Sequence, residues 1–425
     1  MYENLYGKKL LVIGADVNDR EIVRTAKSMG VHTIAVDWNT DYSKSPAKLI
    51  ADETWDMDYR DVASLAERCQ KEHVDGVMAG YSETRVLLAA QLSELLGKPF
   101  YADEEIVRIT RDKRNFKQLC MKYKIPVPME FCANGKLSQK DLEKMEYPVI
   151  VKPADYGGRF GITICNDSSE LDAAVEKALA CSESKTVVVE EYIKGIEMAA
   201  IYNLSNGEIA LALLNDKYQL IDDGKSTTLC NASVTPSKHL KLYLETVDPH
   251  IRDFLRGINA KNGIAFFQMV VGPKGICVFE MGYRLNGGND QHIIEQFNGI
   301  NHMKMLISYS LTGSMGDDIS KNNPAFNKYV ITYLAYVRGG LVKNLSCQAK
   351  MGQDGVFAVT QKVFPGSMIK NNYTTQQEAF VVKLMADSLE DIQAKVKKIE
   401  EGIVIEGENG EDLYFGKFDT RRLFD

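Results

Sequence analysis

Residues 146–162 read Glu-Tyr-Pro-Val-Ile-Val-Lys-Pro-Ala-Asp-Tyr-Gly-Gly-Arg-Phe-Gly-Ile, and this stretch decides the fold. The β-branched run at 149–151 predicts a short buried strand that ends at Lys152 and is followed by Pro153. A loop with glycines comes next: Gly157, Gly158 and Gly161. Because glycine lets the backbone approach a ligand closely, such a loop can wrap phosphate oxygens with its N–H groups. The stretch therefore favours a strand and a loop that bind phosphate.

A second predicted strand, residues 186–189, runs into Glu190-Glu191-Tyr192-Ile193 and then reaches Glu197. A cationic strand end, a glycine loop and an acid-bearing strand end together suit a nucleoside triphosphate. Lys152 would neutralise phosphate, while the carboxylates would lie near the base and the ribose. Singly, these features also occur at ordinary strand ends and turns, so their order and spacing carry the inference. The chain contains no Gly-x-x-x-x-Gly-Lys-Ser/Thr, which excludes a P-loop.

A predicted hairpin carries the second half of the site, with strands at 264–271 and 276–281 joined by a Gly-Pro-Lys-Gly turn. Gln268 and Glu280 lie at similar distances from the turn, so antiparallel pairing can place both on one face. An amide oxygen beside a carboxylate suits Mg²⁺, which takes few protein oxygens and adds substrate phosphates. Arg284 can stabilise charge that develops on a transferred phosphoryl group. The alternative is a hairpin with a few polar residues on its solvated face.

On these motifs the sequence resembles the ATP-grasp ligases, in particular the branch with biotin carboxylase, carbamoyl phosphate synthetase and the purine-pathway ligases. The resemblance covers most of residues 8–315 and is specific to the superfamily, but it is a poor guide to substrate. The matching positions are Asp112-Lys113, residues 147–153, the glycine loop, Glu190-Glu191-Tyr192-Ile193, Glu197, Gln268, Glu280 and Arg284.

The resemblance implies a role for each matching residue. Phosphate would be bound by Lys113, Lys152, Gly157, Gly158 and Gly161. Adenine would be held by backbone groups of Glu190, Glu191, Tyr192 and Ile193, and the ribose by Glu197. The metal, Mg²⁺ or Mn²⁺, would bind Gln268 and Glu280, and the catalytic residues would be Arg284 and Lys152. ATP and the metal ion are the expected cofactors.

The sequence departs from the family pattern at two positions. The family usually reads Glu-x-Asn-x-Arg, with the asparagine as a further metal ligand, and here that position is Gly282. The upstream ligand is often glutamate and here is Gln268. We expect Asn286, in a Gly-Gly turn beyond Arg284, to fold back and compensate partly. Replacing Gly282 by asparagine should then lower the Mg²⁺ requirement.

Alternating strands and helices predict a small parallel sheet at the start of the chain, followed by antiparallel hairpins. The expected architecture is mixed α/β and α+β, with three parts. Residues 1–99 form a Rossmann-like domain, residues 100–320 a two-subdomain ATP-grasp core with a lid at about 127–193, and residues 325–425 a small α+β domain. The polar stretch 216–226 is expected to be a loop, either at the acceptor site or simply solvated. One long helical segment is predicted at 240–258.

The first strand and turn also raise the question of a dinucleotide site, since Gly14 follows a strand and Asp37 ends the next one. The turn has one glycine where the dinucleotide fingerprint needs three, so we expect a Rossmann-like domain without NAD. Its functional corner would be Ser82-Glu83-Thr84-Arg85, at a strand-to-helix junction. The alternative for this corner is a helix N-cap with solvated charges.

Composition excludes several classes of protein. The net charge of −7 gives no basic field for nucleic acid or for acidic membranes. The 8 cysteines form no Cys-x-x-Cys pair and the 6 histidines no His-Glu-x-x-His, as in a reduced protein without a zinc site. No signal peptide or membrane-spanning run is present, so a cytoplasmic protein is expected.

The resulting hypothesis is an ATP-dependent carboxylate–amine ligase. It would form an amide through an acyl phosphate and release ADP and phosphate from small carboxylate and amine substrates. A homodimer is a possible assembly. One alternative is an enzyme that activates bicarbonate, like biotin carboxylase or carbamoyl phosphate synthetase. Another is a non-catalytic ATP-binding regulator, which the glycine at 282 suggests.

Overall fold

The computed structural model describes residues 4–132, 137–154, 160–223 and 225–425. The chain begins with a parallel sheet of strand order β3-β2-β1-β4 and three neighbouring helices, together the N-terminal unit. Strand β1 is buried along most of its length, as expected where helices cover the faces of a parallel sheet. The elements are β1 (Lys9–Ile13), α1 (Asp19–Ser28), β2 (His32–Asp37), β3 (Glu53–Asp56), α2 (Val62–Lys71), β4 (Gly76–Met78) and α3 (Glu83–Leu96).

A small antiparallel sheet of order β5-β8-β6-β7 follows, within the range 127–193 expected for the lid. Helix α7 packs on it over a core that includes Val149, Val151 and Val189. The elements are α4 (Glu104–Arg111), α5 (Lys113–Lys122), β5 (Glu130–Cys132), α6 (Gln139–Lys144), β6 (Val149–Pro153), β7 (Thr163–Cys165), a 3₁₀ turn (Ser168–Glu170), α7 (Leu171–Cys181) and β8 (Val187–Glu191).

The large sheet runs in the order β13-β12-β9-β10-β11-β14-β18-β16, and β20 pairs with β14. The turn between β9 and β10, the first two of these strands along the chain, has left-handed residues at Asn206 and Gly207, which fits the predicted hairpin. Its strands are β9 (Ile196–Ser205), β10 (Glu208–Asp222), β11 (Lys225–Thr235), β12 (Gly263–Gly272), β13 (Gly275–Gly282), β14 (Tyr329–Val337), β16 (Val356–Gln361), β18 (Glu378–Ala386) and β20 (Tyr414–Phe415).

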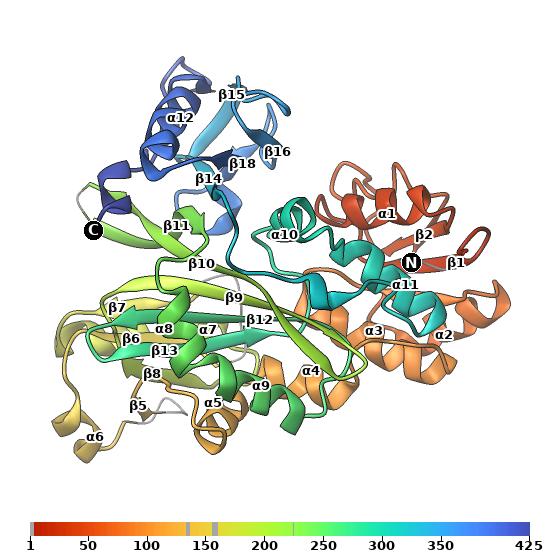
Figure 1. Cartoon of the computed structure of the whole chain (residues 1–425), viewed down its shortest axis with the longest axis horizontal. Coiled ribbons are helices and arrows are strands. Elements are labelled where there is room, and N and C mark those ends of the chain that lie inside the picture. The colour runs from red at the N-terminus through yellow and green to blue at the C-terminus, as the bar shows by residue number, and fades with distance from the viewer. Residues whose placement is uncertain (1–3, 133–136, 155–159, 224) are drawn as a thin grey trace.

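The remaining elements lie around the large sheet, except α11, which packs against β4 and α1 of the N-terminal unit (Figure 1). They are α8 (Leu240–Thr246), α9 (Asp248–Gly257), α10 (Gln291–Asn298), α11 (His302–Thr312), β15 (Gly340–Cys347), β17 (Met368–Ile369), α12 (Leu389–Glu401) and β19 (Ile403–Gly407), with 3₁₀ turns at Ile319–Lys321, Thr375–Gln377 and Thr420–Leu423. The predicted single helix at 240–258 is wrong, because α8 ends at Thr246 and a new helix, α9, begins at Asp248 with Pro249 in its first turn.

The loop predicted at 216–226 is also wrong, because most of this stretch belongs to β10 and β11. Lys217 pairs with Ser233 of β11 and with Glu197 of β9. Tyr218 and Leu220 are buried, while Lys217 and Gln219, which alternate with them, point to the opposite face. The alternation is therefore that of a strand with one polar face, and this face lines the cleft described below.

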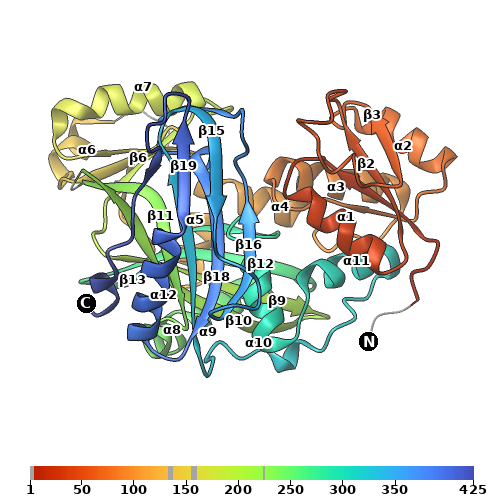
Figure 2. The same ribbon diagram turned by 90° about the horizontal axis from the view of Figure 1, so that it is seen from above.

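The C-terminal strands continue the large sheet directly, since Val234 of β11 pairs with Ile331 of β14. Helix α12 and the strands β17, β15 and β19 add a second layer beyond it (Figure 2). A buried cluster lies between this layer and the large sheet, with Val342, Ile392 and Val382 among its members. Among the described residues, no helix is long and apolar enough to cross a membrane.

Candidate active site

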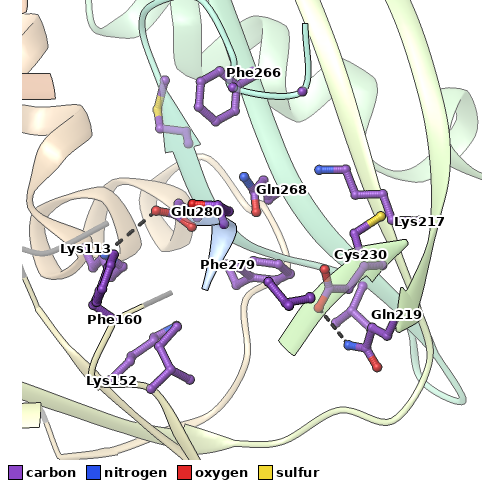
Figure 3. A pocket seen from close by; sticks show the side chains of 18 of the residues that line it. Lys113, Lys152, Phe160, Lys217, Gln219, Cys230, Phe266, Gln268, Phe279 and Glu280 are labelled. Atoms are coloured by element: carbon purple, nitrogen blue, oxygen red, sulfur yellow. Dashed lines mark hydrogen bonds and ion pairs between the residues drawn. The ribbon is translucent and has the colours of Figure 1, made fainter. Parts of the chain in front are cut away.

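A cleft of about 790 Å³ lies where the N-terminal unit, the small sheet and the large sheet meet (Figure 3). Its lining includes these predicted site residues: Lys113, Lys152, Glu190, Glu191, Tyr192, Ile193, Glu197, Gln268, Glu280 and Arg284. Gly161 lies beside Pro153 and Cys181 with a left-handed backbone, and it does not line the cleft. The predictions for Gly157 and Gly158 fall outside the described residues.

Glu190 lies between two lysines at the cleft wall formed by the small sheet. Its carboxylate is 2.5 Å from the Lys152 ammonium and 2.7 Å from the Lys117 ammonium. All three side chains are at most 10% exposed. Burial alone would raise the pKa of Glu190, but the two ammonium groups hold it below its usual value. The carboxylate is therefore charged, and it fixes Lys152 at the end of β6.

Part of the segment expected to hold adenine already uses its backbone N–H groups in hydrogen bonds beside the small sheet. The Glu191 N–H donates to the Met129 carbonyl at 2.9 Å, and the Tyr192 N–H donates to the Pro148 carbonyl at 3.1 Å. Among the described residues, the Ile193 N–H meets no acceptor. An adenine edge would therefore find its donor at Ile193. Glu197, expected at the ribose, accepts a hydrogen bond from Gln219 at 2.9 Å.

Gln268 and Glu280 are direct cross-strand partners on β12 and β13, as the hairpin spacing predicted. The Lys113 ammonium lies 3.8 Å from Glu280. Across the described ranges, no group of three or more His, Cys, Asp or Glu is placed to hold a metal. One amide oxygen and one carboxylate fit Mg²⁺ only if nucleotide phosphates supply further oxygens. Both residues line the same cleft as Lys113 and Lys152.

Gly282 leaves room for the ring of Phe266, its cross-strand partner. The backbone at 282 is not left-handed, yet a Cβ there would collide with this ring. The Phe266 ring also lies 5.1 Å from the Arg284 guanidinium carbon. An asparagine at 282 would therefore require the Phe266 ring to move, and the expectation that it lowers the Mg²⁺ requirement stays a prediction. The aromatic ring supports Arg284.

Arg284 is held by the N-terminal unit. Its guanidinium donates to the Glu83 carboxylate and to the carbonyl of Leu285. Burial opposes ionisation of Glu83, but the charge of Arg284 holds the pKa of this carboxyl below its usual value. The pair therefore joins the start of α3 to the hairpin strand β13.

The loop after Arg284 is fastened to the C-terminal strands. The Asn286 amide donates to Asp290 at 2.7 Å and accepts the Asp290 N–H at 3.3 Å. Lys383, 1% exposed, lies 3.6 Å from Asp290 and donates to the Gly288 carbonyl at 2.9 Å. Burial lowers the pKa of Lys383. The expectation that Asn286 reaches the metal is wrong, because its side chain is bonded to Asp290 and does not line the cleft.

The corner at 82–85 divides into two roles. Ser82 caps helix α3, and Glu83 faces the cleft. Arg85 forms a buried ion pair with Asp19 at 2.5 Å and a partly exposed one with Asp16 at 2.7 Å, and burial raises the pKa of Asp19 to about 7. The Arg85 side chain also fills the space over Gly14. Arg85 is therefore a packing residue, and the turn where a dinucleotide would lie is occupied.

Sequence reasoning missed several residues in or beside the cleft. Lys117 does not line the cleft but bonds Glu190 in its wall, and it lies one helical turn beyond Lys113, a spacing that could have revealed it. Others belong to the large sheet and to segments beside its C-terminal strands: Ser233, Thr332, Tyr336, Lys362, Thr375 and Glu378. No local signal marks these, because their strands meet the site only through pairing of β10, β11, β14 and β18.

Comparison with known proteins adds to this geometry. Residues 122–220 match the family described as D-ala D-ala ligase C-terminus. The chain is 28% identical over 211 residues to formate-dependent phosphoribosylglycinamide formyltransferase of Sulfolobus acidocaldarius, covering 48% of this chain and 52% of that protein. It therefore spans about half the length of the curated relatives it matches.

Two solved structures resemble almost the whole chain. Phosphoribosylglycinamide synthetase from Anaerococcus prevotii has a TM-score of 0.73 at 18% identity and covers 95% of this chain and 100% of its own. L-amino acid ligase from Bacillus licheniformis has a TM-score of 0.77 at 17% identity and covers 95% and 99%. At these identities the likeness shows the fold, and it confirms the predicted mixture of parallel and antiparallel α/β architecture.

Proposed function

We propose that this chain, which belongs to the ATP-grasp superfamily of enzymes as its motifs predicted, is an ATP-dependent carboxylate–amine ligase. One observation carries the proposal. Lys113, Lys152 and Arg284 line the same cleft as the paired oxygen donors Gln268 and Glu280. Phosphoryl transfer between two anions requires positive charge and a metal ion. Here cations from three elements lie beside a pair of oxygen donors that suit a metal ion.

The charges of the cleft support this reading. An attacking carboxylate and a triphosphate repel each other, so the cleft must neutralise both. Most of its cations already have acidic partners: Lys113 with Glu280, Lys152 with Glu190, and Arg284 with Glu83. Lys217 also lines the cleft, and within the described residues it forms no ion pair. Its ammonium extends into the cleft on the side of Gln268 (Figure 3). It is available for an incoming anion.

The reaction would run in two steps. A carboxylate oxygen of the acid attacks the γ-phosphorus of ATP, the bond to the β-γ bridging oxygen breaks, and ADP leaves. The amine nitrogen then attacks the carbonyl carbon of the acyl phosphate, inorganic phosphate leaves, and the nitrogen gives up a proton. Lys113 and Lys152 would bind the phosphates, and Arg284 would stabilise charge on the phosphoryl group and on the tetrahedral adduct.

Gln268 and Glu280 would hold Mg²⁺, together with phosphate oxygens. The bound ion supplies charge neutralisation at the γ-phosphoryl group. Ile193 would receive the adenine edge, and Glu197 would bind the ribose. Each of these roles is consistent with the position of the residue in the cleft wall.

A bicarbonate-activating enzyme is the second candidate. The chain is 29% identical over 221 residues to the carbamoyl phosphate synthase large chain of Methanocorpusculum labreanum, covering 46% of this chain and 20% of that one. In the bicarbonate case, ADP release would depend on bicarbonate and would not need an organic acid.

The test is ADP release across a matrix of acids and amines, with bicarbonate as a separate arm. The proposed function expects ADP only when an organic acid and an amine are both present, with an amide as product. Release that needs bicarbonate alone would favour the second candidate. No release in any arm, from protein shown to bind MgATP, would favour the non-catalytic alternative.

A further inference from the structure

An ion pair lies in the far end of the cleft, on the C-terminal strands. The Lys362 ammonium is 2.5 Å from the Glu378 carboxylate, and both residues line the cleft. Lys362 follows β16, and Glu378 begins β18. Their side chains are 17% and 8% exposed. None of the phosphate or metal groups proposed above uses this pair.

The pair keeps unused bonding capacity. Within the described residues, Lys362 donates one side-chain hydrogen bond and Glu378 accepts it with one oxygen. An ammonium has three donors and a carboxylate has two oxygens, so each partner can bond a further group. Because both are largely desolvated, a ligand that completes these bonds gains more than it would in water.

The charges around the pair are balanced. Lys383 and Asp290 form the neighbouring buried pair, and the charge of Lys362 contributes to the lowered pKa of Lys383. Two ammonium groups thus face two carboxylates at this end of the cleft. A ligand with a net charge would upset that balance, whereas a neutral ligand with separated charges preserves it.

The cleft wall around this pair is suited to a small organic molecule. Leu334 and Val381 offer apolar surface, and Thr332 and Thr375 offer hydroxyl groups. Tyr336 closes the wall, since its hydroxyl donates to the Cys230 carbonyl at 2.7 Å. The end of the cleft therefore combines one dipolar anchor with a mixed wall.

We infer that this end of the cleft binds an α-amino acid as one of the two substrates of the ligase. The carboxylate of the amino acid bonds Lys362 and its ammonium bonds Glu378, so that two opposite dipoles lie head to tail. The inference rests on the proposed function, whose substrates it narrows to a zwitterion. Either component of the reaction can be the amino acid, and the experiment separates the two cases.

The test measures binding of the standard amino acids to protein saturated with MgADP, by calorimetry. The tightest binder is compared with its amide, which lacks the carboxylate charge, and with its N-acetyl form, which lacks the ammonium. Each blocked form should bind at least about tenfold more weakly, the scale of one lost charged hydrogen bond. Turnover with the blocked forms then assigns the component: the amide reacts only as an amine, and the N-acetyl form only as an acid.

The variants are Lys362→Met, Glu378→Gln and the double change Lys362→Met/Glu378→Met. The double variant removes both charges and keeps chain length, so it guards against a misfolded single variant with an unpaired buried charge. Lys398→Met is the matched control, since Lys398 pairs with Asp354 at 2.6 Å in the same C-terminal layer, largely exposed and away from the cleft lining. Thermal unfolding and MgADP affinity report whether each variant is folded.

The expected result is a loss of amino acid affinity of about tenfold or more in the cleft variants, with MgADP affinity unchanged and the control like wild type. The inference is overturned if no amino acid binds, if the blocked forms bind equally, or if the folded double variant keeps wild-type affinity. These results leave the ligase proposal standing when other acids and amines release ADP. Failure to bind MgADP would instead overturn the proposed function, and this inference with it.

Discussion

The Lys152 ammonium lies 2.5 Å from the Glu190 carboxylate, which also holds Lys117 at 2.7 Å. The lysine proposed to meet phosphate is thus positioned by an acid of its own sheet. Lys117 also lies 3.4 Å from Glu130, so the ammonium charges of Lys117 and Lys152 are shared by two carboxylates. A phosphate group entering the cleft would meet the Lys152 ammonium without having to order its side chain.

The phosphate-binding lysines give the first prediction. Lys152→Met and Lys113→Met should each weaken MgATP binding by roughly 1.5–3 kcal/mol, the scale of hydrogen bonds to charged groups. Calorimetry measures the change. Lys241→Met serves as control, because Lys241 is 90% exposed. Wild-type affinity in both cleft variants would refute the phosphate site.

Glu190→Gln should destabilise the fold at neutral pH by about 3–5 kcal/mol, since it leaves the buried Lys152 ammonium without its carboxylate and Lys117 with Glu130 alone. The folded-state pKa of Glu190 is lowered, so its contribution is complete above the unfolded pKa of about 4.5 and is lost as pH falls through the folded value. Urea unfolding should therefore show a difference between variant and wild type that shrinks below about pH 4.5. A difference independent of pH would contradict the ion-pair account.

Gly282→Asn should lower stability by about 1–3 kcal/mol, because the new side chain overlaps the Phe266 ring. Combining it with Phe266→Leu should recover part of the loss, as expected for two residues in contact. Thermal unfolding of the single and double variants tests this. A Gly282→Asn protein as stable as wild type, with a lower Mg²⁺ requirement, would show that the ring does not exclude a metal ligand.

Arg284→Met should lower kcat by about 10²–10³-fold, the range for losing one group that stabilises transition-state charge. MgATP affinity should change little, because the ground-state phosphates would be bound by the lysines. Steady-state kinetics and calorimetry on the same protein separate the two effects. Equal losses in kcat and in MgATP affinity would place Arg284 in nucleotide binding instead.

The hairpin and the first lid strand were predictable because their signals are local. Gln268 and Glu280 lie at matching distances from one turn, and Lys152 ends an apolar run next to a proline. Lys362 and Glu378 were not predictable. They enter the cleft only because β14 joins β11, far away in the chain, and no spacing in the sequence reports that pairing. The misread stretch at 216–226 has the same origin, since a polar strand face looks like a loop until its neighbours are known.

The central claim is that the chain joins an acid to an amine through an acyl phosphate. The most direct measurement uses an acid substrate from the turnover matrix with ¹⁸O in its carboxylate, and follows the products by phosphorus NMR. The account predicts ADP together with inorganic phosphate that carries ¹⁸O from the acid. AMP and pyrophosphate as products, or phosphate without ¹⁸O, would contradict it.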